Sequence, residues 1–271
     1  MSEAAPKDAE EEPSAATSTD PLEVIVRAGV VKDVIGQMQS IVDEGVFQIG
    51  REGLYVGVVD PANVAMLEID LEPKAFESVG DGQFPIGLDI NRLEDYLKRA
   101  SKSDPVEFEY LPETRKMEIR HEKREFNMAA IDPDSMRNGP DDMVPDVPVS
   151  FSVAVSEFRA AIEDADLVAD HVIVEADPDA EEIRVLGNGD TDDVRTVFGN
   201  EGLEEAQVPE EVRSIFSTDY LVGDDGMLNP MPKDAILSVK LGDEMPLKAV
   251  HELDDGRGSV EIGLAPRIVS D

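Results

Sequence analysis

The residue types that most often carry enzyme chemistry are scarce or scattered in this sequence. There is no cysteine, so thiolate catalysis, disulfide bonds and cysteine-ligated metals are excluded. The three histidines, His121, His171 and His251, stand alone, and no pair has the spacing of metal ligands. Residues 187–193, GNGDTDD, faintly resemble a calcium loop, but Gly199 stands where such a loop needs a bidentate glutamate. With no GxSxG, P-loop or GxGxxG motif either, the sequence predicts no catalytic residue, no metal site and no cofactor.

Carboxylates could act as acid–base pairs, but their abundance here removes their diagnostic value. The 271 residues include 61 Asp and Glu against 24 Lys and Arg, a net charge of −37. The acidic residues are spread over nearly every segment, whereas a surface made for a basic partner would concentrate them in a patch. At molar salt the Debye length falls to about 3 Å, which screens most of their mutual repulsion. The composition therefore indicates adaptation to a molar-salt cytoplasm, and it neither supports nor excludes DNA binding.

Changes in composition divide the chain into a tail, two folded segments and a linker. Residues 1–20 are rich in Ala, Glu, Ser, Thr and Pro, which predicts a disordered acidic tail. Residues 132–148 contain four prolines and several Asp, so they form neither a helix nor a central strand. We predict a first domain over 21–131, this segment as a connecting loop, and a second domain over 149–271. The loop also carries apolar residues that a fully solvated linker would not need: Met136, Met143, Val144 and Val147.

The two predicted domains repeat one pattern. Apolar residues alternate in 22–26 and again in 151–155, which predicts a strand with one buried face at the start of each domain. An amphipathic helical stripe follows each strand, over 31–42 in the first domain and 158–169 in the second. The apolar positions of the two stripes agree at a constant offset of 127 residues. This agreement indicates an internal duplication.

Later elements extend the repeat and define the fold class. Residues 54–56 correspond to 183–185, and a helical pattern over 90–100 has a weaker counterpart over 216–221. Each domain then ends in alternating strands. The sequence thus predicts an α+β fold of two duplicated domains, each an antiparallel sheet with two helices packed on one face. Such sheets leave edge strands unpaired, and head-to-tail pairing of identical chains would close a ring if the rotation per chain allows it.

Residues 53–76, GLYVGVVDPANVAMLEIDLEPKAF, resemble the signature segment of the PCNA family of DNA sliding clamps. The segment has a glycine, alternating apolar residues, Asp60 before a short turn, and Phe76 at its end. Residues 131–135 and 264–268 are similar to the family's loop entry and closing motif, in archaeal form. The resemblance covers about residues 22–269, and with the acidic composition it indicates a haloarchaeal clamp. It implies a non-enzymatic processivity factor for DNA polymerase, in which three chains form a ring with helices inside, sheets outside and duplex DNA in the hole.

The resemblance also implies three sets of functional residues. Cations on the helices would face DNA, an apolar pocket under the connecting loop would bind partner peptides, and edge strands would join the trimer. The implied partners are DNA polymerase, the clamp loader, flap endonuclease and ligase, each through a short peptide motif. The DNA-facing set is Lys32, Lys98, Arg99, Lys102 and Arg159; the pocket is Val59, Asn63, Met66, Val144, Pro145, Val149, Pro246, Gly263, Ala265 and Pro266; the trimer edges are Phe126 and Met128, and Ile183 and Val185.

The sequence departs from the family pattern in ways that leave alternatives open. Gln39, Asp95 and Glu163 stand where the family is usually basic, so the hole would be weakly charged. Gly223 and Gly226 weaken the last helix by about 1 kcal/mol each. A specialised or heterotrimeric clamp-like subunit is therefore one alternative, and a hydrolase using carboxylate or metal chemistry is another. No apolar run approaches the roughly 18 residues of a membrane span and no secretory signal is present, so we expect a cytoplasmic location without membrane contact.

Overall fold

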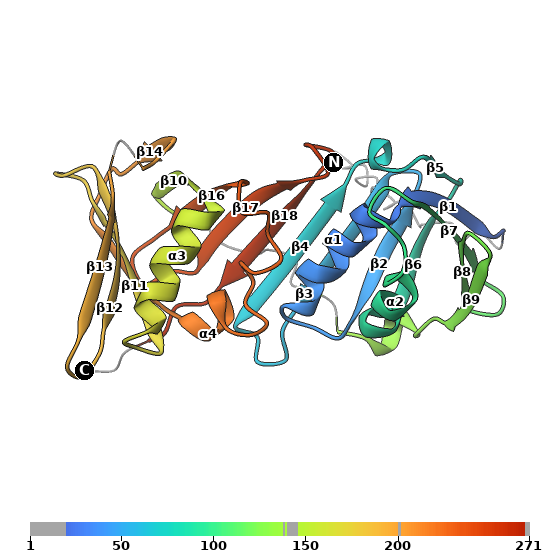
Figure 1. Cartoon of the computed structure of the whole chain (residues 1–271), viewed down its shortest axis with the longest axis horizontal. Coiled ribbons are helices and arrows are strands. Elements are labelled where there is room, and N and C mark those ends of the chain that lie inside the picture. Colours follow the sequence, from blue (N-terminus) through green and yellow to red (C-terminus); the bar gives the residue numbers. More distant parts are fainter. Residues whose placement is uncertain (1–19, 138, 140–145, 200–201, 269–271) are drawn as a thin grey trace, which may run out of the picture.

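The computed structural model describes residues 20–137, 139, 146–199 and 202–268. These residues form an elongated molecule in which the α-helices lie on one face of the β-sheets (Figure 1). Two of these helices fall in each half, as the sequence predicted. The helices are α1 (Ala28–Gln39), α2 (Ile90–Leu97), α3 (Val155–Asp166) and α4 (Thr218–Val222), with short 3₁₀ turns η1 (Pro73–Ala75) and η2 (Pro133–Ser135).

Helices α1 and α3 confirm the internal repeat. Each has 12 residues, and both ends of α3 lie 127 residues after the matching ends of α1. Neither helix has a side-chain cap at its start. Instead, N–H groups at the start of each helix donate to backbone carbonyls of a distant loop. The Gly29 N–H donates to the Lys102 carbonyl at 2.9 Å, and the Val155 N–H donates to the Ala235 carbonyl at 2.9 Å. A Cβ on Gly29 would lie 2.8 Å from the Lys102 carbonyl oxygen, so only glycine allows this close approach.

A central antiparallel sheet of nine strands runs through both halves. Its two parts join where β18 of the second half pairs with β4 of the first over seven residues. Each half therefore divides its strands between two sheets, where the sequence predicted one sheet per domain. The order is β14 (Glu205–Gln207), β10 (Val149–Ala154), β16 (Ile236–Leu241), β17 (Leu247–Leu253), β18 (Gly258–Leu264), β4 (Ala65–Leu71), β3 (Gly53–Val59), β2 (Glu44–Gly50) and β6 (Gln83–Asp89).

Two smaller antiparallel sheets stand at the two ends of the molecule (Figure 1). Each of these sheets has two edge strands that pair on one side only. The first-half sheet has the order β5 (Ser78–Val79), β1 (Leu22–Arg27), β7 (Pro105–Leu111), β8 (Lys116–His121) and β9 (Arg124–Ala129). The second-half sheet has the order β13 (Asp193–Phe198), β12 (Glu182–Asn188), β11 (His171–Asp177) and β15 (Val212–Ser217).

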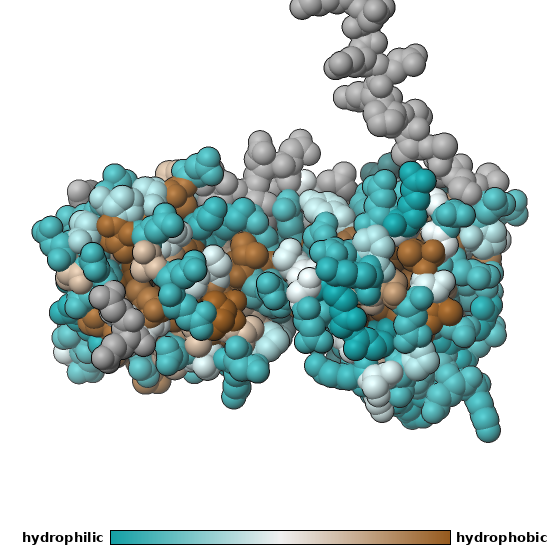
Figure 2. Space-filling model, turned by 90° about the horizontal axis from the view of Figure 1, so that it is seen from above, coloured by the Kyte–Doolittle hydropathy of each residue, from teal (hydrophilic) through white to brown (hydrophobic). Residues whose placement is uncertain are grey.

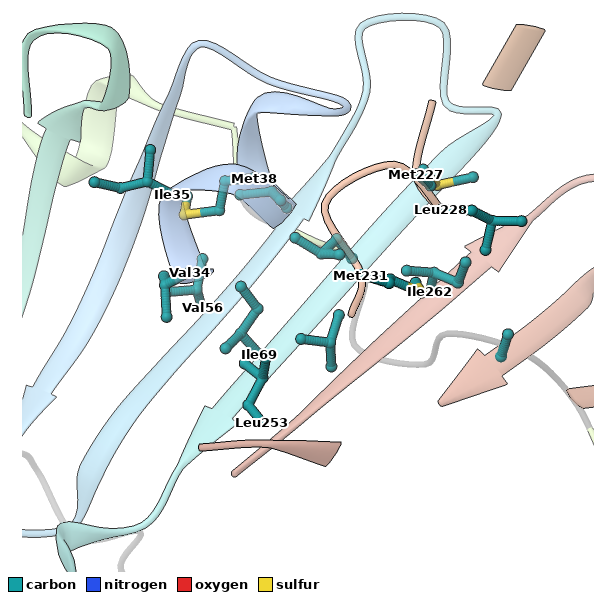
Figure 3. Packing of buried hydrophobic residues seen from close by; sticks show 14 of the residues in the cluster. Val34, Ile35, Met38, Val56, Ile69, Met227, Leu228, Met231, Leu253 and Ile262 are labelled. Carbon is teal, nitrogen blue, oxygen red and sulfur yellow. The ribbon is translucent and has the colours of Figure 1, made fainter. Parts of the chain in front are cut away.

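The loop after α4 fills the joint between the halves. Helix α4 ends after five residues at Gly223, as the two glycines led us to expect, and Phe216 belongs to β15 and not to a helix. A Cβ on Gly226 would lie 2.6 Å from the Leu221 carbonyl oxygen, so the tight turn there requires glycine. Three side chains of this loop join the apolar cluster formed by α1, β4 and β18 (Figure 3). They are Met227, Leu228 and Met231.

His251 of β17 is buried near this joint and predicts a pH-dependent stability. Its Nδ1 carries the proton, because it lies 3.0 Å from the Glu252 carbonyl oxygen, which can only accept. Burial lowers the pKa of His251, although the Glu252 carbonyl and the charge of Asp33 oppose that effect. The unfolded chain therefore binds a proton more readily than the folded chain, so stability should fall as pH drops below about 6.5.

The measurement is urea unfolding between pH 7.5 and 5.5 in molar KCl. We expect His251→Phe to show a shallower loss of unfolding free energy over this range than the wild type. His171→Gln, on the exposed start of β11, should keep the contribution of His251. Equal slopes for wild type and His251→Phe would contradict the assignment.

Candidate functional site

The outer face of the central sheet, away from the helices, brings most of the predicted pocket residues together. In β3, β4 and β18 the residues that face the helices are fully buried, and the alternate residues face outward. Val59 pairs with Met66, and Met66 pairs with Gly263, so the three form one transverse row on the outer face. Gly263 contributes no side chain to this row beside the flexible thioether of Met66. Val59 and Met66 are half-buried, and Lys248 of the next strand pairs with Gly263 at the end of the row. The exposed apolar surface of Val59 and Met66 suits an apolar ligand side chain.

A second apolar row lies next to the first. The Ala265 N–H donates to the Val64 carbonyl at 2.8 Å, which continues the β18–β4 pairing by one residue. Pro246 precedes Leu247, whose partner is Leu264, so Pro246 lies opposite Ala265 in the same register. Residues of this row are half-buried, as is Pro266 after it. We refer to the two rows together as the outer groove, which consists of Val59, Val64, Met66, Pro246, Gly263 and Ala265.

One turn ties the outer groove to both halves of the chain. Asp60, 4 % exposed, accepts hydrogen bonds from the N–H groups of Ala62 (3.0 Å), Val64 (2.7 Å) and Ala65 (2.8 Å). It also accepts one at 2.9 Å from the hydroxyl of Tyr220 on α4. Burial raises the pKa of Asp60, but the backbone donors and Tyr220 outweigh it and hold the pKa below its ordinary value. The ionised carboxylate thus holds the turn and bonds it to the second half.

Asn63 occupies the tip of the same turn. Its φ is 57°, in the left-handed region that Asn tolerates better than most residues. Arg137, from the start of the connecting loop, donates to the Asn63 Oδ1 and to the Asp60 carbonyl, both at 3.2 Å. Asn63 therefore lies at the end of the outer groove as a contact for the loop. No local pattern singled out Arg137 or Tyr220, because each lies more than 70 residues from its partner.

The described residues at the two ends of the connecting loop contact the central sheet or the turns beside it. Gly139 lies over Gly57 of β3, since a Cβ on Gly139 would be 2.9 Å from the Gly57 carbonyl carbon. At the far end of the loop, Val147 packs against Gly242, at 2.9 Å from the position of a Cβ there. Val144 and Pro145, two predicted pocket residues, lie outside the described residues.

Among the described residues, the placement of Val149 and of Val59 differs from the predicted pocket. Val149 does not face the groove: it is fully buried on β10 and pairs with Leu241, so it is a core residue. Val59 also lines a cavity of about 480 Å³, together with Met136 and Arg137 from the start of the connecting loop. Apolar alternation alone could not assign Val149 to one face, because a shift of one residue reverses the face of every side chain in a strand.

The predicted DNA-facing cations lie on or beside the helices, and most are engaged by the protein itself. Lys32 donates to the Ala100 carbonyl at 2.6 Å. Arg99 is exposed and has no ion pair among the described residues. The other three form ion pairs: Lys98 with Asp95 (2.6 Å), Lys102 with Asp33 (3.1 Å) and Arg159 with Glu163 (2.7 Å). These carboxylates remove much of the positive charge from the helical face, as Asp95 and Glu163 led us to expect.

The edge strands correct one prediction. Phe126 and Met128 lie on β9, which is a free edge, and Phe126 stacks on Tyr96 with ring centroids 4.5 Å apart. Ile183 and Val185 were predicted at the other edge, but they lie on β12, which pairs with both β11 and β13. The edge strands of that sheet are β13 and β15, and β13 is the one next to β12. Both strands show alternation, and only the pairing partners decide which one is outermost.

Within the described residues no group of three or more His, Asp or Glu side chains is arranged to hold a metal ion. None of the described helices is long and apolar enough to cross a membrane.

A duplicated chain with helices on one face, apolar residues on the outer face of its central sheet and edge strands at opposite ends has the features of a ring-forming clamp subunit. The family model described as "Proliferating cell nuclear antigen, N-terminal domain" matches residues 22–134. A DNA polymerase sliding clamp of Natronomonas pharaonis is 39% identical over 249 residues, covering 91% of this chain and 98% of that protein. The corresponding protein of Haloarcula marismortui is 35% identical over 249 residues, with the same coverage. The chain belongs to the PCNA family of DNA polymerase sliding clamps.

Solved structures agree with this family. A structure described as "C-terminal region of FEN-1 bound to A. fulgidus PCNA" has a TM-score of 0.84 and 32% identity, covering 92% of this chain and 100% of that chain. PCNA of Thermococcus kodakaraensis has a TM-score of 0.79 at 23% identity, covering 91% of this chain and 100% of that one, which supports the fold.

Proposed function

We propose that this chain is the subunit of a ring that encircles duplex DNA and keeps a DNA polymerase and other replication proteins on it. The single observation that carries the proposal is the duplicated two-domain build with edge strands, β9 and β13, in the sheets at opposite ends of the molecule. A protein of this kind needs no catalytic residue, because a topological link to DNA retains its partners mechanically. We propose that the protein acts in the cytoplasm, where the DNA of a haloarchaeal cell lies.

The ring would form by pairing the free edge of β9 in one subunit with the free edge of β13 in the next. Unpaired backbone groups on an exposed edge strand favour pairing with another strand. Because the two edges differ and lie at opposite ends of the subunit, the contact is head-to-tail, and it closes when the rotation per subunit matches the number of subunits. We propose three identical subunits.

The helical face would then line the hole. Its cations would touch phosphates without reading bases, and the ion pairs of Lys98, Lys102 and Arg159 limit the strength of that contact. This limitation matters little at molar salt, where gains from counterion release are small. The closed ring itself would hold the DNA.

The outer groove would bind short peptide motifs of partner proteins, among them the DNA polymerase, the clamp loader, a flap endonuclease and a ligase. Two observations support this proposal: Met66 and Val59 present apolar side chains side by side on the outer face, and the similar structure of A. fulgidus PCNA is bound to the C-terminal region of FEN-1. Met side chains adapt to differently shaped plugs, which suits several partners.

Sedimentation equilibrium in about 2–3 M KCl tests the ring, since screening is short-ranged at that ionic strength. A mass near three times 29.5 kDa is the expected result. A stable monomer would refute the homotrimer and favour a subunit that assembles only with different clamp chains. Retention on nicked circular DNA, with loss on linearised DNA, would then test the topological link.

A groove variant tests partner binding separately. We expect Met66→Asp to weaken binding of a peptide with an aliphatic residue followed by two aromatics by at least about tenfold, because a charge would replace an apolar contact surface. Fluorescence anisotropy at molar KCl measures the affinity. Ser238→Asp, also on the outer face but on β16, is the control and should bind as the wild type does. Unchanged binding by Met66→Asp would place the peptide site elsewhere.

A further inference from the structure

An open cavity of about 780 Å³ lies at the joint between the halves, and none of the outer-groove residues lines it. It opens where β16 and β17 stop pairing: their register covers residues 238–240 and 248–250, although both strands continue beyond it. Helix α1 and the hairpin between β17 and β18 supply further walls, so the cavity combines residues of both halves. The polar side chains of the lining belong to Asp33, Ser238, His251, Glu252, Asp254 and Asp255.

Two buried acceptor atoms of this lining have no hydrogen-bond donor. His251 is 2 % exposed, and its Nε2 has no partner among the described residues. Its Nδ1 donates to the Glu252 carbonyl, and burial lowers the pKa of the ring, so at pH 7.5 Nε2 carries a free lone pair. Arg27 and Arg257 bond the Oδ1 of Asp254, whereas its buried Oδ2 has no partner in the described chain. Because unpaired buried acceptors cost free energy, the cavity should hold a donor beside them.

The charge around the cavity is negative. No Lys or Arg side chain lines it in the described part of the chain. Lys102 pairs with Asp33 at 3.1 Å, and Arg257 reaches Asp255 at 3.6 Å, both from outside the lining. Glu252 is exposed and forms no ion pair with any described residue. The ligand that matches this cavity is therefore a cation with N–H donors.

We propose that this cavity binds the primary ammonium group of an aliphatic amine, which donates to the His251 Nε2 and the Asp254 Oδ2. An ammonium group has three N–H donors and a positive charge, so it matches both the acceptors and the carboxylates around them. The cavity volume lies within the range of about 300–1,000 Å³ that is typical of small-molecule sites. The rest of the amine would extend along the exposed carboxylate of Glu252. Such a site is independent of the outer groove.

A metal ion fits the cavity less well than an ammonium group. No group of three or more His, Asp or Glu among the described residues is arranged to hold one. Hard cations such as K⁺ prefer oxygen ligands to an imidazole nitrogen, so K⁺ should compete weakly at His251. Buried charges are also screened by salt less than exposed ones. Binding of the ammonium group should therefore persist in molar KCl.

Nitrogen NMR of the full-length protein, labelled in its histidines, tests this site in molar KCl at pH 7.5. The probes are putrescine, for a free amine, and Nα-acetyl-lysine amide, for a lysine side chain of a partner protein. We expect the Nε2 signal of His251 to shift saturably with at least one probe, while that of His171 on β11 stays unchanged. The tighter probe identifies the source of the ammonium group. Fully methylated putrescine keeps both charges but has no N–H, and it should bind at least about tenfold more weakly.

Two charge variants localise the binding. Glu252→Gln removes a carboxylate from the cavity, and Glu107→Gln removes one from an exposed position on β7. We expect Glu252→Gln to weaken amine binding on the order of 2- to 5-fold, and Glu107→Gln to leave it unchanged.

Three results would overturn the proposal. The first is a His251 signal that neither amine shifts, which would leave water as the donor in the cavity. The second is equal binding of the methylated probe, which would indicate general charge attraction without hydrogen bonds. The third is an equal effect of Glu252→Gln and Glu107→Gln, which would place the amine outside the cavity.

Discussion

Replacing Asp60 with alanine is expected to lower the free energy of unfolding by about 3–5 kcal/mol. The carboxylate accepts three backbone N–H groups and the Tyr220 hydroxyl, and Ala65, one of these donors, is fully buried. Without Asp60 a buried donor has no acceptor, and the turn at the end of the outer groove is released. Urea unfolding in molar KCl, followed by circular dichroism, measures the loss, and anisotropy should show weaker binding of the motif peptide.

Two variants separate the roles of Asp60. Tyr220→Phe removes only the hydroxyl that bonds the turn to the second half, so it should cost about 1 kcal/mol. Asp60→Asn keeps an acceptor oxygen and should lower the free energy of unfolding by an intermediate amount.

The contribution of Asp60 to stability also depends on pH. Since the folded pKa of Asp60 is lowered, the carboxylate stabilises the fold above the unfolded pKa of about 3.9, and this stabilisation is lost as pH falls through the lower folded value. A wild-type stability for Asp60→Ala would show that the turn does not need the carboxylate.

Lowering the KCl concentration from about 3 M to about 0.1 M is expected to unfold the chain or dissociate its assembly. The net charge of −37 is spread over both halves, and the Debye length grows from below 3 Å to about 10 Å over this range. Repulsion across the whole surface then opposes a stability that amounts to only about 5–15 kcal/mol for a typical domain. Thermal unfolding at stepped KCl concentrations and sedimentation at the same concentrations measure the two effects.

A charge-reversed variant is the matched test of this cause. Glu210 and Glu211 are exposed residues just before β15, and neither forms an ion pair within the described part of the chain. Glu210→Lys/Glu211→Lys should move the unfolding transition toward lower KCl. The neutral pair Glu210→Gln/Glu211→Gln should move it about half as far. An identical salt requirement for all three proteins would indicate specific ion binding instead of general repulsion.

The extent of agreement between sequence and structure follows from the range of each interaction. The sequence predicted two kinds of element correctly: the helices α1 and α3, and the alternation of inward and outward residues in β3, β4 and β18. Each depends on neighbours a few residues apart. The pairing of β4 with β18, which unites the two halves, joins residues far apart in sequence, and nothing local specifies it. The same reason explains the error at Ile183, since β12 and β13 alternate alike and differ only in their partners.

The sequence by itself determined that this protein is a duplicated α+β chain with an acidic surface, a proline-rich connecting loop and no catalytic constellation. These properties depend on composition and on short-range periodicity. Only the tertiary structure decided that Met66 and Gly263 lie side by side, that Asp60 bonds to Tyr220, and that carboxylates engage most of the predicted DNA-facing cations. Each of these contacts depends on side chains that strand pairing and core packing bring together. The free energy of pairing and packing is shared across the whole fold, so it leaves no pattern in any one segment of the sequence.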